Sequence, residues 1–263
     1  MRTTQSNLQK MYQSGEKITV LTCYDACFST ILENAGIDVL LVGDSLGNVL
    51  HGNETTLAVS LDDMCYHTRC VYAGTNKTFI LTDMPFGTFQ VSPEQTFENA
   101  TKLLAAGAQM VKIEGGHVMA ETTRFLTQRG IPVCAHIGLT PQSIHQLGGY
   151  KLQGKSEQAS EQLLEDARIL EKAGANMLLM ELVPATLAKN ITKELSIPTI
   201  GIGAGIDCSA QVLVLHDMLG LYPGKKPRFV KDFMADSSNI QLAITNYVDE
   251  VKSGRFPCVE HQF

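Results

Sequence analysis

Short apolar runs alternate with longer stretches of helical periodicity along the whole chain. The short runs are apolar and rich in β-formers, which predicts strands. In the longer stretches, apolar residues recur every three or four positions, which is typical of amphipathic helices. We predict eight strands, at residues 18–25, 38–45, 78–85, 109–116, 131–139, 176–183, 197–205 and 211–217.

Two of the helical stretches carry clear boundary signals. The first opens at Ser92, a helix-capping residue followed by proline at the first helical position, and ends at Gly107. The second follows the same plan between Ser156 and Gly174. Regular strand–helix alternation of this kind predicts a parallel sheet.

Eight strand–helix units in 263 residues favour an α/β fold of the closed (β/α)8 barrel type over an open doubly wound sheet. The gap at residues 206–210, between the last two predicted strands, leaves little room for a helix. No linker or low-complexity segment divides the chain, so we expect a single domain over residues 1–263. Extra helices near the two ends, at residues 7–15 and 237–254, are expected to pack outside the barrel.

Composition and charge exclude several classes of protein. The chain is 44% hydrophobic and carries a net charge of −6, which gives no electrostatic footprint for nucleic acid or an anionic membrane. Its seven cysteines form no Cys-x-x-Cys pair, so we expect reduced thiols in a cytoplasmic protein. The amino-terminal segment is polar, and no apolar run is long enough for a membrane helix.

Ionisable residues stand at or near the carboxyl ends of six consecutive predicted strands. In a (β/α)8 barrel the active site lies at these ends. One such residue alone could be a helix cap or a solvated group, but burying unpaired charges costs several kcal/mol each. A functional site therefore explains the series better than a stabilising core does. The six residues are Asp25, Asp44, Asp83, Glu114, His136 and Glu181.

Converging carboxylates repel one another unless a cation lies among them. Oxygen ligands favour a hard ion such as Mg²⁺, although His136 and the cysteines leave zinc open. Lys112 and Glu114 are two residues apart and therefore share one face of a strand. The Lys112 ammonium suits an anionic substrate, and a structural salt bridge is the alternative.

Two further segments are open to more than one interpretation. The glycine-rich residues 201–205 could bind an anion through backbone N–H groups or form a tight turn at the barrel rim. The polar, glycine-containing residues 147–155 could form a lid or an ordinary surface loop.

The string "GDSLG" at residues 43–47 matches a signature of serine esterases, with Ser45 as the nucleophile. That mechanism needs a histidine–aspartate partner late in the chain. The late pair His216–Asp217 lies within an apolar strand pattern, so we favour Asp44, rather than Ser45, as the key residue of this string.

Longer strings resemble the ketopantoate hydroxymethyltransferase family over residues 5–262. They are "YDACFSTILENAGIDVLLVGDSLGNVLHGNETTL", "MVKIEGG", "PVCAHIGLTPQS", "GGYKLQGK", "MELVP" and "IPTIGIGAG", in the family's order. The resemblance implies a barrel of the phosphoenolpyruvate/pyruvate type. It implies transfer of a hydroxymethyl unit from 5,10-methylenetetrahydrofolate, the co-substrate, to 3-methyl-2-oxobutanoate through a Mg²⁺-stabilised enolate. The product is ketopantoate, in pantothenate and coenzyme A biosynthesis, and the expected assembly is a cytoplasmic homodecamer.

The resemblance also assigns roles to individual residues. The implied Mg²⁺ ligands are Asp44, Asp83 and Glu114. The implied keto-acid contacts are Asp44, Ser45, Asp83 and Lys112. Glu181 is the implied proton acceptor, and Lys112 and His136 complete the catalytic group.

The chain departs from the family pattern in two places, and two other classes of protein stay open. Residues 209–211 read Ser-Ala-Gln where the family often has Asp-Gly-Gln, and residues 51–60 lack a common proline. A metal-dependent lyase or mutase of the phosphoenolpyruvate or isocitrate type would share the same metal and enolate chemistry. A non-catalytic binding barrel would not be expected to keep all its strand-end carboxylates.

Overall fold

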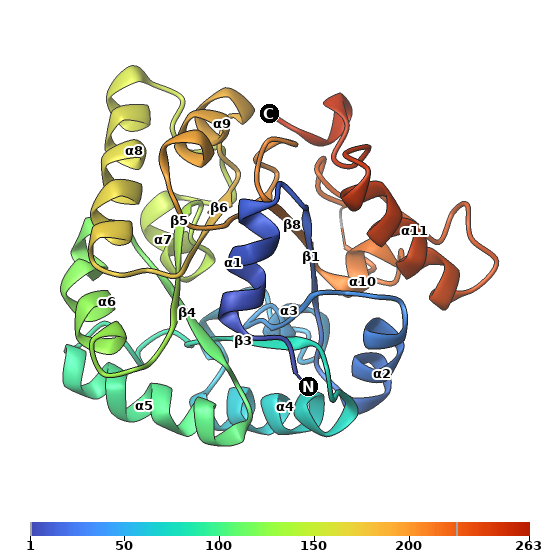
Figure 1. The fold of residues 1–263 in the computed structure, drawn as a ribbon, viewed down its shortest axis with the longest axis horizontal. Helices are drawn as coiled ribbons and strands as arrows, with labels where there is room; N and C mark the ends of the chain where they lie inside the picture. The colour runs from blue at the N-terminus through green and yellow to red at the C-terminus, as the bar shows by residue number, and fades with distance from the viewer. Residues whose placement is uncertain (1, 225) are drawn as a thin grey trace.

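The computed structural model describes residues 2–224 and 226–263, which contain eight parallel strands closed into a barrel in chain order (Figure 1). The predicted (β/α)8 barrel is therefore confirmed. The strands are β1 (Ile18–Thr22), β2 (Val39–Val42), β3 (Phe79–Asp83), β4 (Met110–Glu114), β5 (Val133–Gly138), β6 (Met177–Glu181), β7 (Thr199–Ile202) and β8 (Ala210–Leu213).

Helices cover the outside of this barrel. The longer ones are α1 (Gln5–Gln13), α2 (Ala26–Asn34), α4 (Leu61–Gly74), α5 (Pro93–Ala106), α6 (Ala120–Thr127), α8 (Glu157–Lys172), α9 (Ala185–Glu194) and α11 (Ile240–Lys252). Single turns are α3 (Leu46–Val49), α7 (Ile144–Leu147), α10 (Leu215–Met218), η1 (Thr56–Ala58), η2 (His117–Met119), η3 (Pro141–Ser143) and η4 (Val259–His261). In the described part of the chain, no helix has the length and apolar character needed to cross a bilayer.

The two predicted helix starts are confirmed in atomic detail. The Ser92 hydroxyl accepts a hydrogen bond from the Gln95 backbone N–H at 3.2 Å, and the helix ends at Gly107, whose φ is 120°. The Ser156 hydroxyl caps α8 in the same way, through the backbone N–H of Ala159 at 3.2 Å. All seven cysteines are free, as the sequence predicts.

The last strand is shorter than predicted. It ends at Leu213, and the chain turns at once into α10, so the prediction that His216 and Asp217 lie in a strand is wrong. The backbone N–H of Leu215 donates to the Thr22 hydroxyl instead of to a neighbouring strand, at 2.9 Å. As the short gap predicts, the described residues between β7 and β8 contain no helix.

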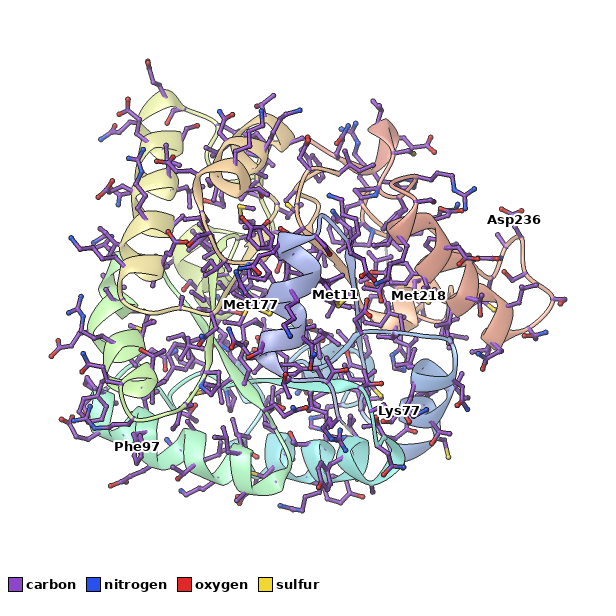
Figure 2. All side chains as sticks on the ribbon, in the orientation of Figure 1. Met11, Lys77, Phe97, Met177, Met218 and Asp236 are labelled. Carbon is purple, nitrogen blue, oxygen red and sulfur yellow. The ribbon has the colours of Figure 1, made fainter. Side chains whose placement is uncertain are left out.

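The interior of the barrel is filled with apolar side chains, and α1 covers one end of it. Leu8 is 1% exposed and packs with inward-facing side chains of all eight strands, and Met11 adds to the same cluster. The side chains of α1 also bond the loops that precede strands, since the Tyr12 hydroxyl donates to Leu195 O at 2.7 Å. Figure 1 shows α1 across the middle of the ring, and Figure 2 labels Met11 close to Met177 there.

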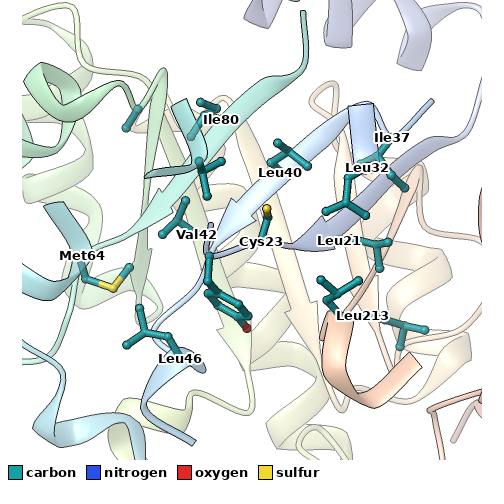
Figure 3. Packing of buried hydrophobic residues seen from close by; sticks show 14 of the residues in the cluster. Leu21, Cys23, Leu32, Ile37, Leu40, Val42, Leu46, Met64, Ile80 and Leu213 are labelled. Atoms are coloured by element: carbon teal, nitrogen blue, oxygen red, sulfur yellow. The ribbon is translucent and has the colours of Figure 1, made fainter. Parts of the chain in front are cut away.

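The outward faces of the strands form a second apolar layer with the helices. Leu40 and Val42 of β2 point outward, and Figure 3 shows them in the cluster that includes Leu32 and Ile37. Where the β7–β8 connection supplies no helix, α11 packs against β1, and its buried Tyr247 hydroxyl donates to backbone carbonyls of β1 and β8 at 2.9 and 2.8 Å. The amino end of the barrel interior and the outward faces of the strands are thus apolar. The polar residues gather at the carboxyl ends of the strands, at the opposite opening of the barrel.

A carboxylate on α2 holds the loop that leads into β3. Glu33 accepts hydrogen bonds from the backbone N–H groups of Lys77 at 2.7 Å and Thr78 at 3.0 Å, and from the Thr75 hydroxyl. Burial alone would raise the pKa of Glu33, but these hydrogen bonds lower it to about 2 from an ordinary value of 4.5.

We predict that Glu33→Gln destabilises the protein at neutral pH by about 1–2 kcal/mol, the value of charge-assisted hydrogen bonds at a partly solvated site. The folded-state pKa is depressed, so this stabilisation is present above about pH 4.5 and is lost as the pH falls toward 2. Urea unfolding of both proteins across this range should show their difference shrinking with acidity. The exposed Glu161, replaced by glutamine, is the matched control, and a pH-independent difference would contradict the account.

Candidate active site

Strand register brings the charged side chains to one level at the carboxyl end of the barrel. Asp83 of β3 pairs with Lys112 of β4, and Glu114 of β4 pairs with His136 of β5. Because side chains alternate between the two faces of a strand, Lys112 and Glu114 both point inward. At the end of β6, Glu181 pairs with Gly138, which has no side chain to obstruct it.

These residues line a cavity of about 740 Å³. Of the six strand-end residues that the sequence singles out, five lie in its wall, together with Ser45 and Lys112; the five are Asp44, Asp83, Glu114, His136 and Glu181. Asp25 does not belong to the site. Because β1 ends at Thr22, Asp25 is already the exposed N-cap of α2, where it accepts from the Phe28 N–H at 2.9 Å.

Lys112 is the cationic centre of the cluster. Its ammonium lies 3.2 Å from Asp83 Oδ1, 3.6 Å from Glu114 Oε1 and 3.1 Å from His136 Nδ1, and its side chain is 4% exposed. Burial by itself would lower the pKa of Lys112, but the surrounding carboxylates, Asp83 first, raise it above its ordinary value. Lys112 is therefore a permanent positive charge in this cavity.

For the carboxyl groups of the cluster, burial outweighs the attraction of the ammonium, so their pKa values are raised. Burial, together with repulsion from Glu114, raises the pKa of Asp44 to about 6. Burial also raises the pKa of Asp83 to about 7, although Lys112 opposes the shift. The pKa of Glu114 is raised by burial as well. One ammonium is thus not enough to neutralise these acids, which would hold their negative charge more readily beside a second cation.

His136 is neutral and connects Lys112 to Glu181. Burial, reinforced by the nearby ammonium, lowers the pKa of His136 to about 4. Since an ammonium only donates, Nδ1 accepts from Lys112 and the ring proton lies on Nε2. His136 Nε2 lies 3.4 Å from Glu181 Oε2, but the two atoms are not aligned for a hydrogen bond. Burial raises the pKa of Glu181, whose side chain is 15% exposed at the cavity wall.

Gln142 orients two of the acids, and the sequence reasoning missed it. Its side-chain amide donates to Asp44 Oδ2 and to Met84 O, both at 2.9 Å, and its backbone N–H donates to Glu114 Oε2 at 2.9 Å. It lies in η3 after β5, within the string "GLTPQS", but a glutamine in a loop carries no charge signal.

Ser45 does not have the surroundings of a serine nucleophile. Its hydroxyl is paired with the hydroxyl of buried Tyr24 at 2.8 Å, and burial raises the pKa of Tyr24 above its ordinary value. The His216 ring contacts the Tyr24 ring at a centroid distance of 5.7 Å, and no described group bonds its buried Nδ1. The histidine–aspartate relay that an esterase needs is not assembled here.

The donor set fits a divalent metal ion. Four carboxyl groups at the strand ends lie around one buried ammonium. The buried oxygens Asp83 Oδ1 and Glu114 Oε1 contact that ammonium as ion pairs but accept no well-aligned hydrogen bond from the described residues. The described carboxylates of the barrel do not form a group of three with ligand atoms all within 4.8 Å of one another. Mg²⁺ needs only one or two direct carboxylate ligands and completes its shell with water and substrate oxygens, so the remaining acids can hold it through water.

The part of the cavity lining that comes from Tyr222, residues 226–229 and Phe263 is aromatic and basic rather than acidic. It combines aromatic rings with positive charge, and the residues that form it are Tyr222, Lys226, Arg228, Phe229 and Phe263. Tyr150, from residues 147–155, which could form a lid or an ordinary surface loop, also lines the cavity and is 56% exposed. Of the glycine-rich residues 201–205, Ile202 reaches the cavity, while Gly203 and Gly205 turn the chain with φ values of 61° and 87°.

The chain is similar to a family described as ketopantoate hydroxymethyltransferase, whose model matches residues 2–259. A 3-methyl-2-oxobutanoate hydroxymethyltransferase from Nitrosospira multiformis is 68% identical over 263 residues, which cover 100% of both chains. Another protein of this name, from Nitrosomonas eutropha, is 65% identical over 262 residues, covering 100% of this chain and 97% of that protein.

Solved structures show the same kind of barrel. Phosphonopyruvate hydrolase in complex with oxalate and Mg²⁺ has a TM-score of 0.62 and 13% identity, covering 81% of each chain. The 2,3-dimethylmalate lyase of the PEP mutase/isocitrate lyase superfamily has a TM-score of 0.61 and 15% identity, covering 96% of this chain and 98% of that chain. This likeness concerns the fold alone, and it agrees with the closed (β/α)8 barrel.

We predict that Gln142→Leu weakens the binding of Mg²⁺ by about 10–100-fold, the usual effect of removing a group that orients metal ligands. Leucine has a similar size but cannot donate to Asp44 or Met84. Isothermal titration of the folded protein with Mg²⁺ measures the change, and the exposed Gln128, replaced by leucine, is the control. Equal affinities in all three proteins would show that Gln142 does not position a metal ligand.

Proposed function

The chain belongs to the ketopantoate hydroxymethyltransferase family, and we propose that its barrel transfers a hydroxymethyl group from 5,10-methylenetetrahydrofolate to 3-methyl-2-oxobutanoate. Transfer to this keto acid follows from the family and from the names of relatives that match the whole chain. The folate donor and the roles of individual residues are the proposal. The observation that carries it is the buried cluster of acids around Lys112, which suits a divalent ion and an anionic substrate.

The keto acid is placed by groups at the ends of β2, β3 and β4. Lys112 supplies a buried positive charge for oxygens that bear negative charge. The Ser45 hydroxyl donates to the substrate carboxylate when it turns away from Tyr24. Asp44 and Asp83 border the same space and would hold the ion beside the substrate's oxygens.

Asp44, Asp83 and Glu114 are the residues that would hold Mg²⁺. When bound, the ion supplies Lewis-acid stabilisation of the negative charge that forms on the substrate's ketone oxygen. Phosphonopyruvate hydrolase, which has a similar fold, was solved in complex with oxalate and Mg²⁺, and this supports the choice of ion. Gln142 keeps the Asp44 and Glu114 carboxylates in place through its side-chain and backbone donors.

Glu181 is the proposed base that removes the proton from C3 of the keto acid. Its raised pKa makes it a better proton acceptor than a solvated carboxylate. The neutral His136, fixed by Lys112, lies between Glu181 and the acids and separates the base from the proposed ligands. The carbon that loses its proton then forms the new bond to the methylene carbon of the folate. Both C–N bonds of that carbon break, water supplies the hydroxyl group of the product, and tetrahydrofolate leaves.

The cavity has room for the folate beside the keto acid. A volume of about 740 Å³ is typical of pockets for drug-sized ligands, whereas the five-carbon keto acid fills only a small part of it. The aromatic rings of Tyr222 and Phe229 suit a pterin or benzoyl ring, and Lys226 and Arg228 suit the glutamate carboxylates of folate. The cytoplasmic homodecamer that the resemblance implies stays a prediction.

We predict that Glu181→Gln lowers kcat for folate-dependent ketopantoate formation by about 10²–10⁴-fold, the usual contribution of a positioned general base. Glutamine keeps the size of the side chain but cannot accept the proton. The assay follows product formation from 3-methyl-2-oxobutanoate and 5,10-methylenetetrahydrofolate with Mg²⁺ present, and product should not form when the folate is omitted.

The exposed Glu54 lines the same cavity and, replaced by glutamine, is the matched control. Mg²⁺ affinity should be unchanged in Glu181→Gln, because Glu181 is not among the proposed ligands. A kcat within a few-fold of the unmodified protein, or product without folate, would overturn the assignment.

A further inference from the structure

A turn near the carboxyl end of the chain carries a second group of metal-ligating side chains, away from the barrel acids. In the described part of the chain, Cys258, Glu260 and His261 are the one group of three whose ligand atoms all lie within 4.8 Å of one another. Cys258 Sγ lies 3.0 Å from His261 Nδ1 and 3.4 Å from Glu260 Oε1.

Local backbone geometry explains why these side chains meet. Residues Val259–His261 form the 3₁₀ turn η4, and the His261 N–H donates to Cys258 O at 2.9 Å. In a 3₁₀ turn, side chains three positions apart are eclipsed, so Cys258 and His261 stand on the same side. The proximity is therefore a consequence of the turn and not of chance contact between flexible side chains.

Neighbouring residues fix the turn in place. The His261 ring packs against the buried Phe256 ring at a centroid distance of 5.3 Å, and His261 is 9% exposed. Arg228 Nε donates to the backbone carbonyl of Glu260 at 3.1 Å. The imidazole is thus held by packing, while the Cys258 thiol is open to solvent and accessible to an incoming ion.

The spacing and chemistry of the three groups suit zinc. Tetrahedral zinc, with bonds of about 2.3 Å to sulfur and 2.0–2.1 Å to nitrogen, separates the two ligand atoms by about 3.6 Å. The Cys258–His261 pair needs to open by only about half an ångström to reach that value. A thiolate and an imidazole are soft and borderline ligands, which disfavours Mg²⁺ at this turn.

We propose that Cys258, Glu260 and His261 form a site for a Zn²⁺-class ion, with the fourth position open to water. The site is joined to the cavity through the end of the chain. Phe263 lines the cavity, and its carbonyl accepts from the N–H of Ala185, the first residue of α9, at 2.8 Å. Zinc at the turn therefore fixes the segment that forms part of the aromatic, basic wall.

The proposal is tested by the alkylation of individual cysteines in the full chain, followed by mass spectrometry with and without Zn²⁺. Mg²⁺ is kept in excess so that the barrel acids do not compete for zinc. Cys27 is also exposed and serves as the internal control. At free Zn²⁺ about ten times its Kd, alkylation of Cys258 should slow about tenfold, because only chains without zinc carry a free thiolate. Alkylation of Cys27 should not change.

Two variants separate a metal site from simple shielding of the thiol. His261→Gln and Glu260→Gln keep the Cys258 thiol but remove one ligand each, so the protection by Zn²⁺ should be lost or greatly weakened in both. Co²⁺ should give sulfur-to-metal charge-transfer absorption in the unmodified protein and not in Cys258→Ser. Equal slowing at Cys27 and Cys258, full protection in both variants, or no Co²⁺ absorption would overturn the proposal.

Discussion

The imbalance of charge at the carboxyl end of the barrel is the constraint on which the site depends. Four carboxyl groups at the strand ends, those of Asp44, Asp83, Glu114 and Glu181, lie around the buried ammonium of Lys112. Burial raises the pKa values of these acids, so without a further cation part of their charge is lost to protonation. The proposed divalent ion would restore the balance and would stabilise negative charge on the ketone oxygen of a 2-oxo acid. The same constraint explains why Gln142 is needed, since buried carboxylates must be held by donors.

The barrel makes this arrangement possible by separating its two ends. At the amino end of the barrel, Leu8 and Met11 of α1 pack against the apolar interior and cover it. At the carboxyl end, strand register alone sets Asp83 beside Lys112 and Glu114 beside His136. Rigid, hydrogen-bonded strands therefore fix the acids, whereas the aromatic and basic wall comes from loops and the end of the chain.

Periodicity and strand ends revealed most of the fold and the charged part of the site. All eight strands were predicted, because each combines an apolar core with a polar boundary. Asp25 was misplaced because a helix N-cap and a strand-end ligand look alike in sequence, and only the end of β1 at Thr22 distinguishes them. Gln142 was missed because its role depends on contacts between η3, β2 and β4. Likewise, the approach of Cys258 to His261 depends on a 3₁₀ turn that has no periodic signal in three residues.

The central claim is that a divalent ion, held by the acids around Lys112, lets the site remove a proton from the keto acid. Deuterium exchange at C3 of 3-methyl-2-oxobutanoate, followed by NMR in D₂O without folate, tests it most directly. The account predicts exchange that requires the protein and Mg²⁺, stops when a chelator removes the metal and returns when Mg²⁺ is restored. Exchange at the same rate in metal-free protein, or none with saturating Mg²⁺, would contradict it.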